Sequence, residues 1–321
     1  MARRQFLAAG LFAVGLGLTP AVAQTYPVKP IKMIVPYTPG SPVDVLARVV
    51  TQHVSARLGQ TIVIDNRPGA GTTIGTKLAA NADPDGYTIL IGATSFTIAA
   101  TLYPHLDYDP IKSFTPVAML AVSPQMLVIA PSVPAKTGPE FVAYAKANPG
   151  KLNFGYGLGT LPHILGEAFK TATGIDIASI PYRGGAQAIT DMLGGRIQMN
   201  FGTQSTLLPL IRDGKVRPLA VTTETRAKDL PEVPTMAESG LPQLSLAFSA
   251  GILAPAGTPA AIVAKLNAEI KEAMKSPALA ASMAKLGFEP QFWSPQDYGA
   301  FLAEEARRWP PIVKTSGVQP E

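Results

Sequence analysis

The sequence contains few side chains that could act as a catalytic base. Its three histidines are His53, His105 and His163, and it has no cysteine, which excludes thiol catalysis. Ser41 or Thr160 with His163 is the one nucleophile and base that can be combined. His163 falls in the first turn of an expected helix, where the helix dipole disfavours a proton. The G-x-S-x-G, H-E-x-x-H and Walker A motifs are absent. We expect a neutral His163 that satisfies a loop carbonyl and assign no catalytic residue; a hydrolase built on His163 is the alternative.

Two stretches imitate cofactor or metal motifs and fail at a defining position. Residues 66–75 contain spaced glycines, but the third comes one residue late for a dinucleotide fingerprint. Residues 81–86 imitate the start of a calcium loop, but Pro84 lies inside it and Gly92 stands where the bidentate glutamate is required. The sequence therefore predicts neither a cofactor nor a metal site.

Turns rich in glycine, serine and threonine repeatedly follow a strand and precede a helix. They cover residues 36–44, 66–75, 155–163 and 181–187, and shorter polar loops are expected at 93–97 and 202–206. Each turn directs free N–H groups and the positive end of a helix toward the carboxyl end of a strand, where open α/β sheets bind ligands. Candidate ligand-binding residues in these turns are Gly40, Ser41, Ala70, Thr94, Ser95, Gly157, Thr160, Gly184 and Thr203.

The elements that position these turns alternate between strand and helix. Buried strands are expected at residues 31–35, 61–65 and 87–91, with helices at 43–58 and 74–82. A second block has expected strands at 125–130, 152–156, 197–201 and 216–222 and helices at 139–148, 163–173 and 186–193. A helical tail covers 260–275, 277–286 and 294 to about 308. This order predicts an α/β fold with parallel strands covered by helices.

Two successive α/β blocks followed by the helical tail predict two lobes, each a mainly parallel sheet flanked by helices. We expect the first lobe to hold residues 26–119 and 251–321 and the second to hold residues 120–250. The chain then crosses between the lobes near residues 118–122 and 245–251, which are the expected hinge.

The first residues predict export to the periplasm. Arg3 and Arg4 precede an apolar run at residues 6–18 that is too short to cross a bilayer, and small residues predict a cut near Ala23-Gln24. Residues 1–23 are therefore an expected signal peptide, with an uncleaved membrane anchor as the alternative. The Arg-Arg-x-Phe-Leu pattern also permits the twin-arginine route.

The charge pattern argues against a nucleic-acid partner. The formal net charge is +5, and the basic residues form no stripe and are not interleaved with aromatic residues. A mildly basic surface is compatible with anionic solutes. With 47% hydrophobic residues, the chain can bury a substantial core.

Ordered motifs run through the whole expected mature chain. They lie at residues 26–31, 34–44, 65–71, 84–88, 149–153, 159–163, 181–184, 193–195, 230–235 and 254–259. In these motifs the chain resembles the tripartite tricarboxylate transporter receptors, often called Bug receptors. The resemblance implies a type II binding-protein (Venus flytrap) fold and a receptor without enzymatic activity. It also implies a small carboxylate in the interlobe cleft and its delivery to a membrane permease. Separately, we expect the receptor to be a monomer. The carboxylate could be a dicarboxylate, a tricarboxylate, an acidic amino acid or an aromatic acid.

Carried over by motif, the resemblance implies contacts at Pro39, Gly40, Ser41 and Asp44 in the first lobe and at Gly159, Thr160 and His163 in the second. The chain departs from the family pattern at Ser41, at Tyr156 in a shortened third turn, and at Ser249. These departures leave the size and identity of the ligand open. A sensory module that serves a signalling partner is the alternative to transport.

Overall fold

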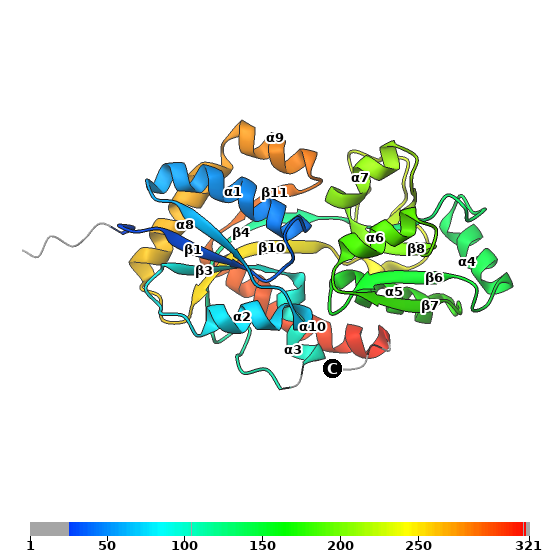
Figure 1. Cartoon of the computed structure of the whole chain (residues 1–321), viewed down its shortest axis with the longest axis horizontal. Helices are drawn as coiled ribbons and strands as arrows, with labels where there is room; N and C mark the ends of the chain where they lie inside the picture. Colours follow the sequence, from blue (N-terminus) through cyan, green and yellow to red (C-terminus); the bar gives the residue numbers. More distant parts are fainter. Residues whose placement is uncertain (1–25, 104, 317, 319–321) are drawn as a thin grey trace, which may run out of the picture.

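A computed structural model describes residues 26–103, 105–316 and 318. The expected signal peptide and its cut near Ala23-Gln24 lie outside the described residues. Figure 1 shows two groups of strands and helices lying side by side, with helix α10 (Pro295–Ser316) running along both. We refer to the two groups as the first and second lobe.

The first lobe is built on a six-stranded sheet with the strand order β11-β4-β10-β3-β1-β2. Its strands are β1 (Ile31–Val35), β2 (Ile62–Asn66), β3 (Thr88–Ala93), β4 (Phe114–Ser123), β10 (Phe248–Pro255) and β11 (Glu289–Trp293). Its helices are α1 (Pro42–Leu58), the short 3-10 helix η1 (Ala70–Thr72), α2 (Thr73–Ala80), α3 (Thr94–Leu102), α8 (Ala260–Met274), α9 (Pro277–Lys285) and α10. The apolar run of β1 is buried at four of five positions because β1 pairs on both edges, with β2 and β3.

The second lobe is built on a five-stranded sheet with the order β7-β6-β8-β5-β9. Its strands are β5 (Gln125–Ile129), β6 (Asn153–Gly157), β7 (Ala178–Tyr182), β8 (Met199–Thr203) and β9 (Arg217–Val221). Its helices are α4 (Gly138–Ala147), α5 (Leu161–Thr173), α6 (Gly185–Leu193), α7 (Gln204–Arg212) and the 3-10 helix η2 (Pro242–Leu244). Helices α5 and α6 each start within four residues of the end of a strand, so their N-termini lie at the carboxyl ends of β6 and β7.

Both sheets are mixed, which corrects the prediction of mainly parallel sheets. β10 runs antiparallel to β3 and β4, and β5 runs antiparallel to β8 and β9. Strands β5 and β10 each enter their sheet from the other lobe and not from a crossover helix on the same sheet. The right-handed crossover that makes neighbouring strands parallel is therefore missing at these two strands.

Two segments that were expected to be loops are helices. α3 begins at Thr94, directly after β3, and α7 begins at Gln204, directly after β8. Most residues of α3 are buried, so α3 lacks the alternating polar face by which a helix is recognised in sequence. α10 also continues past the expected end near Arg308, through two prolines to Ser316, where the buried side chains of Trp309 and Val313 anchor it.

The chain passes between the lobes at two places that one side chain ties together. β4 ends at Ser123 and β5 begins at Gln125, and the chain returns between Leu244 and Phe248. The buried hydroxyl of Thr222 accepts a hydrogen bond from the Gln125 N–H (3.1 Å) and donates one to the carbonyl of Leu246 (2.7 Å). The two crossings are therefore held to each other as well as to their own sheets.

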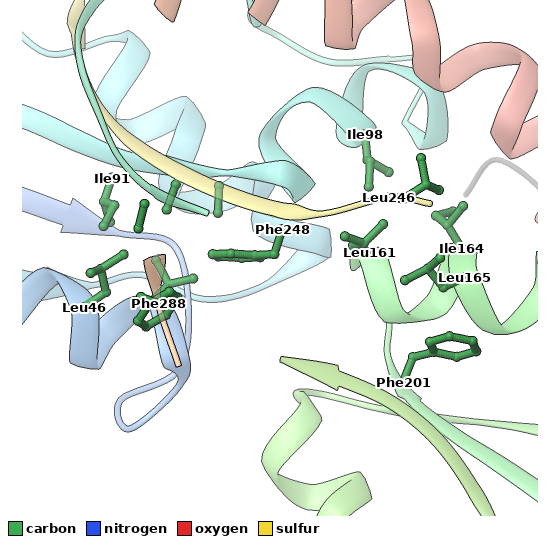
Figure 2. Packing of buried hydrophobic residues seen from close by; sticks show 14 of the residues in the cluster. Leu46, Ile91, Ile98, Leu161, Ile164, Leu165, Phe201, Leu246, Phe248 and Phe288 are labelled. Atoms are coloured by element: carbon green, nitrogen blue, oxygen red, sulfur yellow. The ribbon is translucent and has the colours of Figure 1, made fainter. Parts of the chain in front are cut away.

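A continuous apolar core also joins the lobes. Figure 2 shows Ile98 of α3 beside Leu161 of α5 and Leu246 of the returning crossing, and all three belong to one cluster of buried residues. α10 packs against α3 and β4 in the first lobe and against α5 in the second. Its Arg308 donates a hydrogen bond to the carbonyl of Ser245 (3.1 Å). The structure therefore holds the lobes in a close, packed arrangement.

We expect Thr222→Val to lower the free energy of unfolding by about 2 kcal/mol, because the Gln125 N–H and the Leu246 carbonyl lose their buried partner. Urea denaturation followed by circular dichroism measures the effect. Thr190→Val is the control, since Thr190 is exposed on α6 and its hydroxyl bonds only the Ala186 carbonyl. Equal losses in the two variants would contradict the tie between the crossings.

Candidate functional site

A cavity of about 790 Å³ lies between the lobes. It is lined from the first lobe by residues 36–38, 40–43, 68–72, Ser95 and Phe248, and from the second by Gln125, Leu158, Thr206, Ile189 and residues 160–162, 181–186 and 200–203. This lining includes the N-terminal ends of α1, η1, α3, α5 and α6 and the strand end that leads into α7. The turns of both lobes therefore face one shared cavity, as their position at strand carboxyl ends predicts.

The lobes approach each other closely at the rim of this cavity. A Cβ atom added to Gly159 of the second lobe would lie 2.9 Å from the Cα of Gly71 in the first. A Cβ atom added to Gly184 would lie 3.4 Å from the hydroxyl oxygen of Thr38. These approaches from two different turns show that the cavity lies between closed lobes.

Seven of the residues expected to bind a ligand line the cavity: Gly40, Ser41, Ala70, Ser95, Thr160, Gly184 and Thr203. The structure places six others outside its lining: Pro39, Asp44, Thr94, Gly157, Gly159 and His163. Pro39 is exposed on the first turn, and Gly157 lies at the end of β6, where an added Cβ would be 3.2 Å from the Gly185 nitrogen. Gly159 faces Gly71 across the rim.

Asp44 stabilises the first turn, residues 36–44, from a buried position outside the cavity lining. Its buried carboxylate accepts hydrogen bonds from the Gly40 N–H (2.9 Å), Arg48 Nε (3.0 Å) and Asn66 Nδ2 (2.9 Å). Burial alone would raise the pKa of Asp44, but these hydrogen bonds from Arg48, Gly40 and Asn66 outweigh it and hold the pKa below its usual value. Ser41 caps α1 by accepting from the Asp44 N–H (3.3 Å). The Gly40 amide, expected to meet a ligand, is already bonded within the turn.

His163 lies under the third turn and not in the cavity. Its ring is buried and stacks on Tyr156, with ring centroids 4.1 Å apart and an interplanar angle of 5°. Within the described residues its Nδ1 has no hydrogen-bond partner, so the expected bond to a loop carbonyl is not made at this atom. Burial lowers the pKa of His163 to about 4, so the ring is neutral at pH 7. The Thr160 hydroxyl donates to the Gly157 carbonyl (2.6 Å) and is not hydrogen-bonded to His163.

Thr94 holds two elements of the first lobe together. Its buried hydroxyl accepts a hydrogen bond from the Ser249 N–H (2.9 Å), which ties the start of α3 to β10. The neighbouring Ser95 lines the cavity instead. The polar stretch at residues 93–97 thus contributes one residue to the cavity and one to the framework.

Sequence reasoning missed several lining residues, of which Arg183 and Gln125 matter most. Arg183 lies between Tyr182 and Gly184 in the fourth turn, and among the described lining residues it alone has a charged side chain. Its neighbour Gly184 was selected, so its position was visible in the sequence but its orientation was not. Gln125 follows Pro124 at the crossing, where no motif marks a binding residue.

The arrangement is suited to an anion. Thr160 and Gly184 are the N-cap residues of α5 and α6; the Thr160 side chain does not bond the first turn of α5, and Gly184 has no side chain that could bond that of α6. Among the described residues, the first-turn N–H groups of Leu161, Gly185 and Ala186 have no backbone partner, whereas the His163 and Gln187 N–H groups bond the Thr160 and Gly184 carbonyls and Pro162 has no N–H. These three amides and the positive helix ends belong to residues that line the cavity, together with Arg183 and with no acidic side chain in the described lining. In the described residues no group of three His, Asp or Glu side chains could hold a metal ion. No helix in the same part of the chain is both long and apolar enough to cross a membrane.

Two lobes of mixed α/β structure that close over a cavity lined by helix N-termini define a solute-binding protein of the Venus flytrap class. The chain belongs to the tripartite tricarboxylate transporter receptor family, because residues 46–318 match the family described as "Tripartite tricarboxylate transporter family receptor". It is 37% identical to protein BugT of Bordetella pertussis over 97% of this chain and 96% of that protein.

Solved structures show the same fold. The structure of the periplasmic binding protein BugD has a TM-score of 0.87 and 33% identity, covering 92% of this chain and all of that one. A Rhodopseudomonas palustris protein solved with adipate has a TM-score of 0.88 and 35% identity over the same shares. MatC from the same organism, with bound malate, has a TM-score of 0.84 and 31% identity, covering 90% of this chain and all of that one. The family is one of solute-binding receptors, and two of these similar proteins were solved with small carboxylates.

Proposed function

We propose that this protein is a periplasmic receptor that binds a small carboxylate between its lobes and delivers it to a tripartite tricarboxylate-type membrane permease. The observation that carries the proposal is the convergence of helix N-termini from both lobes on one cavity whose described lining contains an arginine and no acidic side chain. The relatives solved with adipate and malate support the carboxylate class. The signal-like N-terminus and the periplasmic description of BugD support the location.

A site of this kind can bind a carboxylate with micromolar affinity, and binding requires no catalytic residue. A helix N-terminus stabilises an anion by about 0.3–1 kcal/mol when exposed and by up to about 2 kcal/mol when partly buried. Each hydrogen bond to a charged carboxylate adds about 1.5–3 kcal/mol. The two helix N-termini of the second lobe and Arg183 supply part of the roughly −8 kcal/mol of a micromolar complex; further hydrogen bonds to the carboxylate and burial of the apolar part of the ligand would supply the rest and offset the cost of association. Ser123–Gln125 and residues 245–247 are the proposed hinge at which the lobes would open and close.

Isothermal titration calorimetry of the chain from Gln24 onward against di- and tricarboxylates, acidic amino acids and aromatic acids tests the proposal. We expect at least one member to bind with a dissociation constant in the micromolar range or below. Binding by none of them would contradict the carboxylate assignment. Recovery of permease subunits by the liganded receptor, and not by the ligand-free receptor, tests the delivery step.

We expect Arg183→Gln to weaken binding of the best carboxylate from that panel by about tenfold, because a charged hydrogen-bond donor at the cavity is lost. The remaining affinity should also depend less on salt concentration, since one ionic contact is gone. Arg196→Gln is the control: Arg196 is on the same lobe, pairs with Asp191 and lies outside the described lining. Unchanged affinity in Arg183→Gln would remove this arginine from the site.

A further inference from the structure

Gln125 is held rigidly at the junction of the two lobes. It is the first residue of β5, and its side chain is completely buried. Its N–H donates to the Thr222 hydroxyl (3.1 Å), and its carbonyl accepts from the Thr222 N–H (2.9 Å). Because both of its backbone polar groups are hydrogen-bonded to Thr222, its side-chain amide is held at a defined place in the wall of the cavity.

The side-chain amide of Gln125 has unmet hydrogen-bonding capacity. Neither Nε2 nor Oε1 has a partner among the described residues. A buried amide without partners is costly, and a bound water, an ion or a ligand in the cavity would relieve that cost. The Gln125 amide can offer one donor group and one acceptor to a molecule in the cavity.

Two further lining residues share this property. Asn200 on β8 donates from Nδ2 to the Gly155 carbonyl (2.7 Å), which leaves its Oδ1 without a partner in the described part of the chain. Thr72 contributes an equally unpartnered hydroxyl from the opposite lobe. Gln125 pairs with Thr203 in the β5–β8 register and Asn200 pairs with Val128, so the two side chains leave the sheet on opposite faces. Among the described residues on its face of the sheet, Gln125 therefore supplies the unpartnered amide by itself, at a place distinct from the helix N-termini.

The acceptor of this amide limits the chemistry of the ligand. A carboxylate has no hydrogen to donate, so it can accept from the helix N-termini, from Arg183 and from the Nε2 of Gln125, but it leaves the Oε1 of Gln125 without a partner. A hydroxyl or amide N–H on the ligand can donate to this Oε1. The apolar walls formed by Phe201, Phe248 and Ile189 would accept the carbon skeleton between the two polar ends.

We propose that Gln125 determines specificity by binding a hydrogen-bond-donating substituent on the carboxylate ligand. The substrate class is then a hydroxy- or amide-bearing carboxylate and not an unsubstituted alkane dicarboxylate. This inference rests on the proposed function of the cleft and adds a second recognition site to it.

Calorimetry with matched ligand pairs tests the proposal. The pairs are malate with succinate, 2-hydroxyglutarate with glutarate, and succinamate with succinate, which differ mainly by a donor group. We expect the wild-type chain to bind the donor-bearing member of at least one pair about tenfold more tightly. In Gln125→Leu and Gln125→Met that preference should fall to within about twofold, while affinity for the unsubstituted member stays the same or rises. Gln187→Leu is the control, since Gln187 is exposed on α6 and does not line the described cavity.

The outcomes separate the two proposals. Equal affinities within every pair for the wild-type chain would overturn the role of Gln125 while leaving a carboxylate receptor. An undiminished preference in both Gln125 variants, with a wild-type melting temperature, would overturn it as well. If no carboxylate binds at all, the proposed function fails first and this inference fails with it. Loss of the preference in the Gln125 variants alone supports it.

Discussion

Replacing Gly159 with valine is expected to weaken carboxylate binding by about 100-fold, which corresponds to about 2.7 kcal/mol. Gly159 has φ = 68°, and a Cβ placed there lies 2.9 Å from the Cα of Gly71 and 3.3 Å from the Tyr103 hydroxyl. Gly71 and Tyr103 belong to the other lobe, and a backbone atom cannot turn aside as a side-chain end can. The valine would therefore hold the lobes apart at the rim, and the binding groups of the two lobes would no longer act on the ligand together.

A matched glycine separates this effect from backbone strain. Gly174 ends α5 with φ = 64°, and an added Cβ there meets no atom within 4 Å. Gly174→Val carries the same cost of a left-handed residue, about 1–2 kcal/mol of unfolding free energy. Gly159→Val should share that loss, but only Gly159→Val should lose affinity in calorimetry. Wild-type affinity in Gly159→Val would show that the bound state does not use this approach of the lobes.

The second large effect is a loss of stability in mild acid that comes from His163. Burial lowers the pKa of His163 to about 4 in the folded chain, against about 6.5 for an unfolded histidine. Between these values the unfolded state binds a proton that the folded state does not, so acid favours unfolding. The stability that the neutral ring provides is complete above about pH 6.5 and is lost as the pH falls toward 4. The loss is about 3 kcal/mol, since each pKa unit is worth about 1.4 kcal/mol.

Denaturation midpoints measured from pH 7.5 to pH 4 in wild type and His163→Phe test this expectation. Phenylalanine can retain the stack on Tyr156 but cannot take a proton. We expect the variant to lose about 3 kcal/mol less than wild type over that interval. His105→Phe is the control for the same replacement at an exposed histidine. Parallel profiles for wild type and His163→Phe would show that His163 is not buried as described.

The sequence was informative where local pattern determines structure. The expected strand at residues 31–35 and the expected helices at 43–58 and 163–173 correspond to β1, α1 and α5. It was not informative where burial removes the polar face, as in α3, or where a strand enters from the other lobe, as with β10. The antiparallel pairings follow from the double crossing, which no local pattern encodes.

The candidate site, too, could be predicted from the sequence only in part. The turns were identified because glycine and helix starts leave a composition signal. Which polar groups of a turn remain available to a ligand depends on hydrogen bonds to residues far away in the sequence. Asp44 and Asn66, for example, are 22 residues apart, and together they hold the first turn. Gln125 was missed for a related reason: its importance comes from an amide without a partner inside the fold, and an absent bond has no sequence pattern.

The Thr222 hydroxyl bonds one crossing segment and the backbone of the other, and this restricts how the molecule can move. Two independent connections would let one lobe both tilt and slide against the other. Because the two crossings are joined to each other, the lobes can mainly rotate about an axis that passes through both crossings. Every turn that lines the cavity then swings through the same arc, so we expect solute entry and release to be all-or-none events with a single relaxation rate.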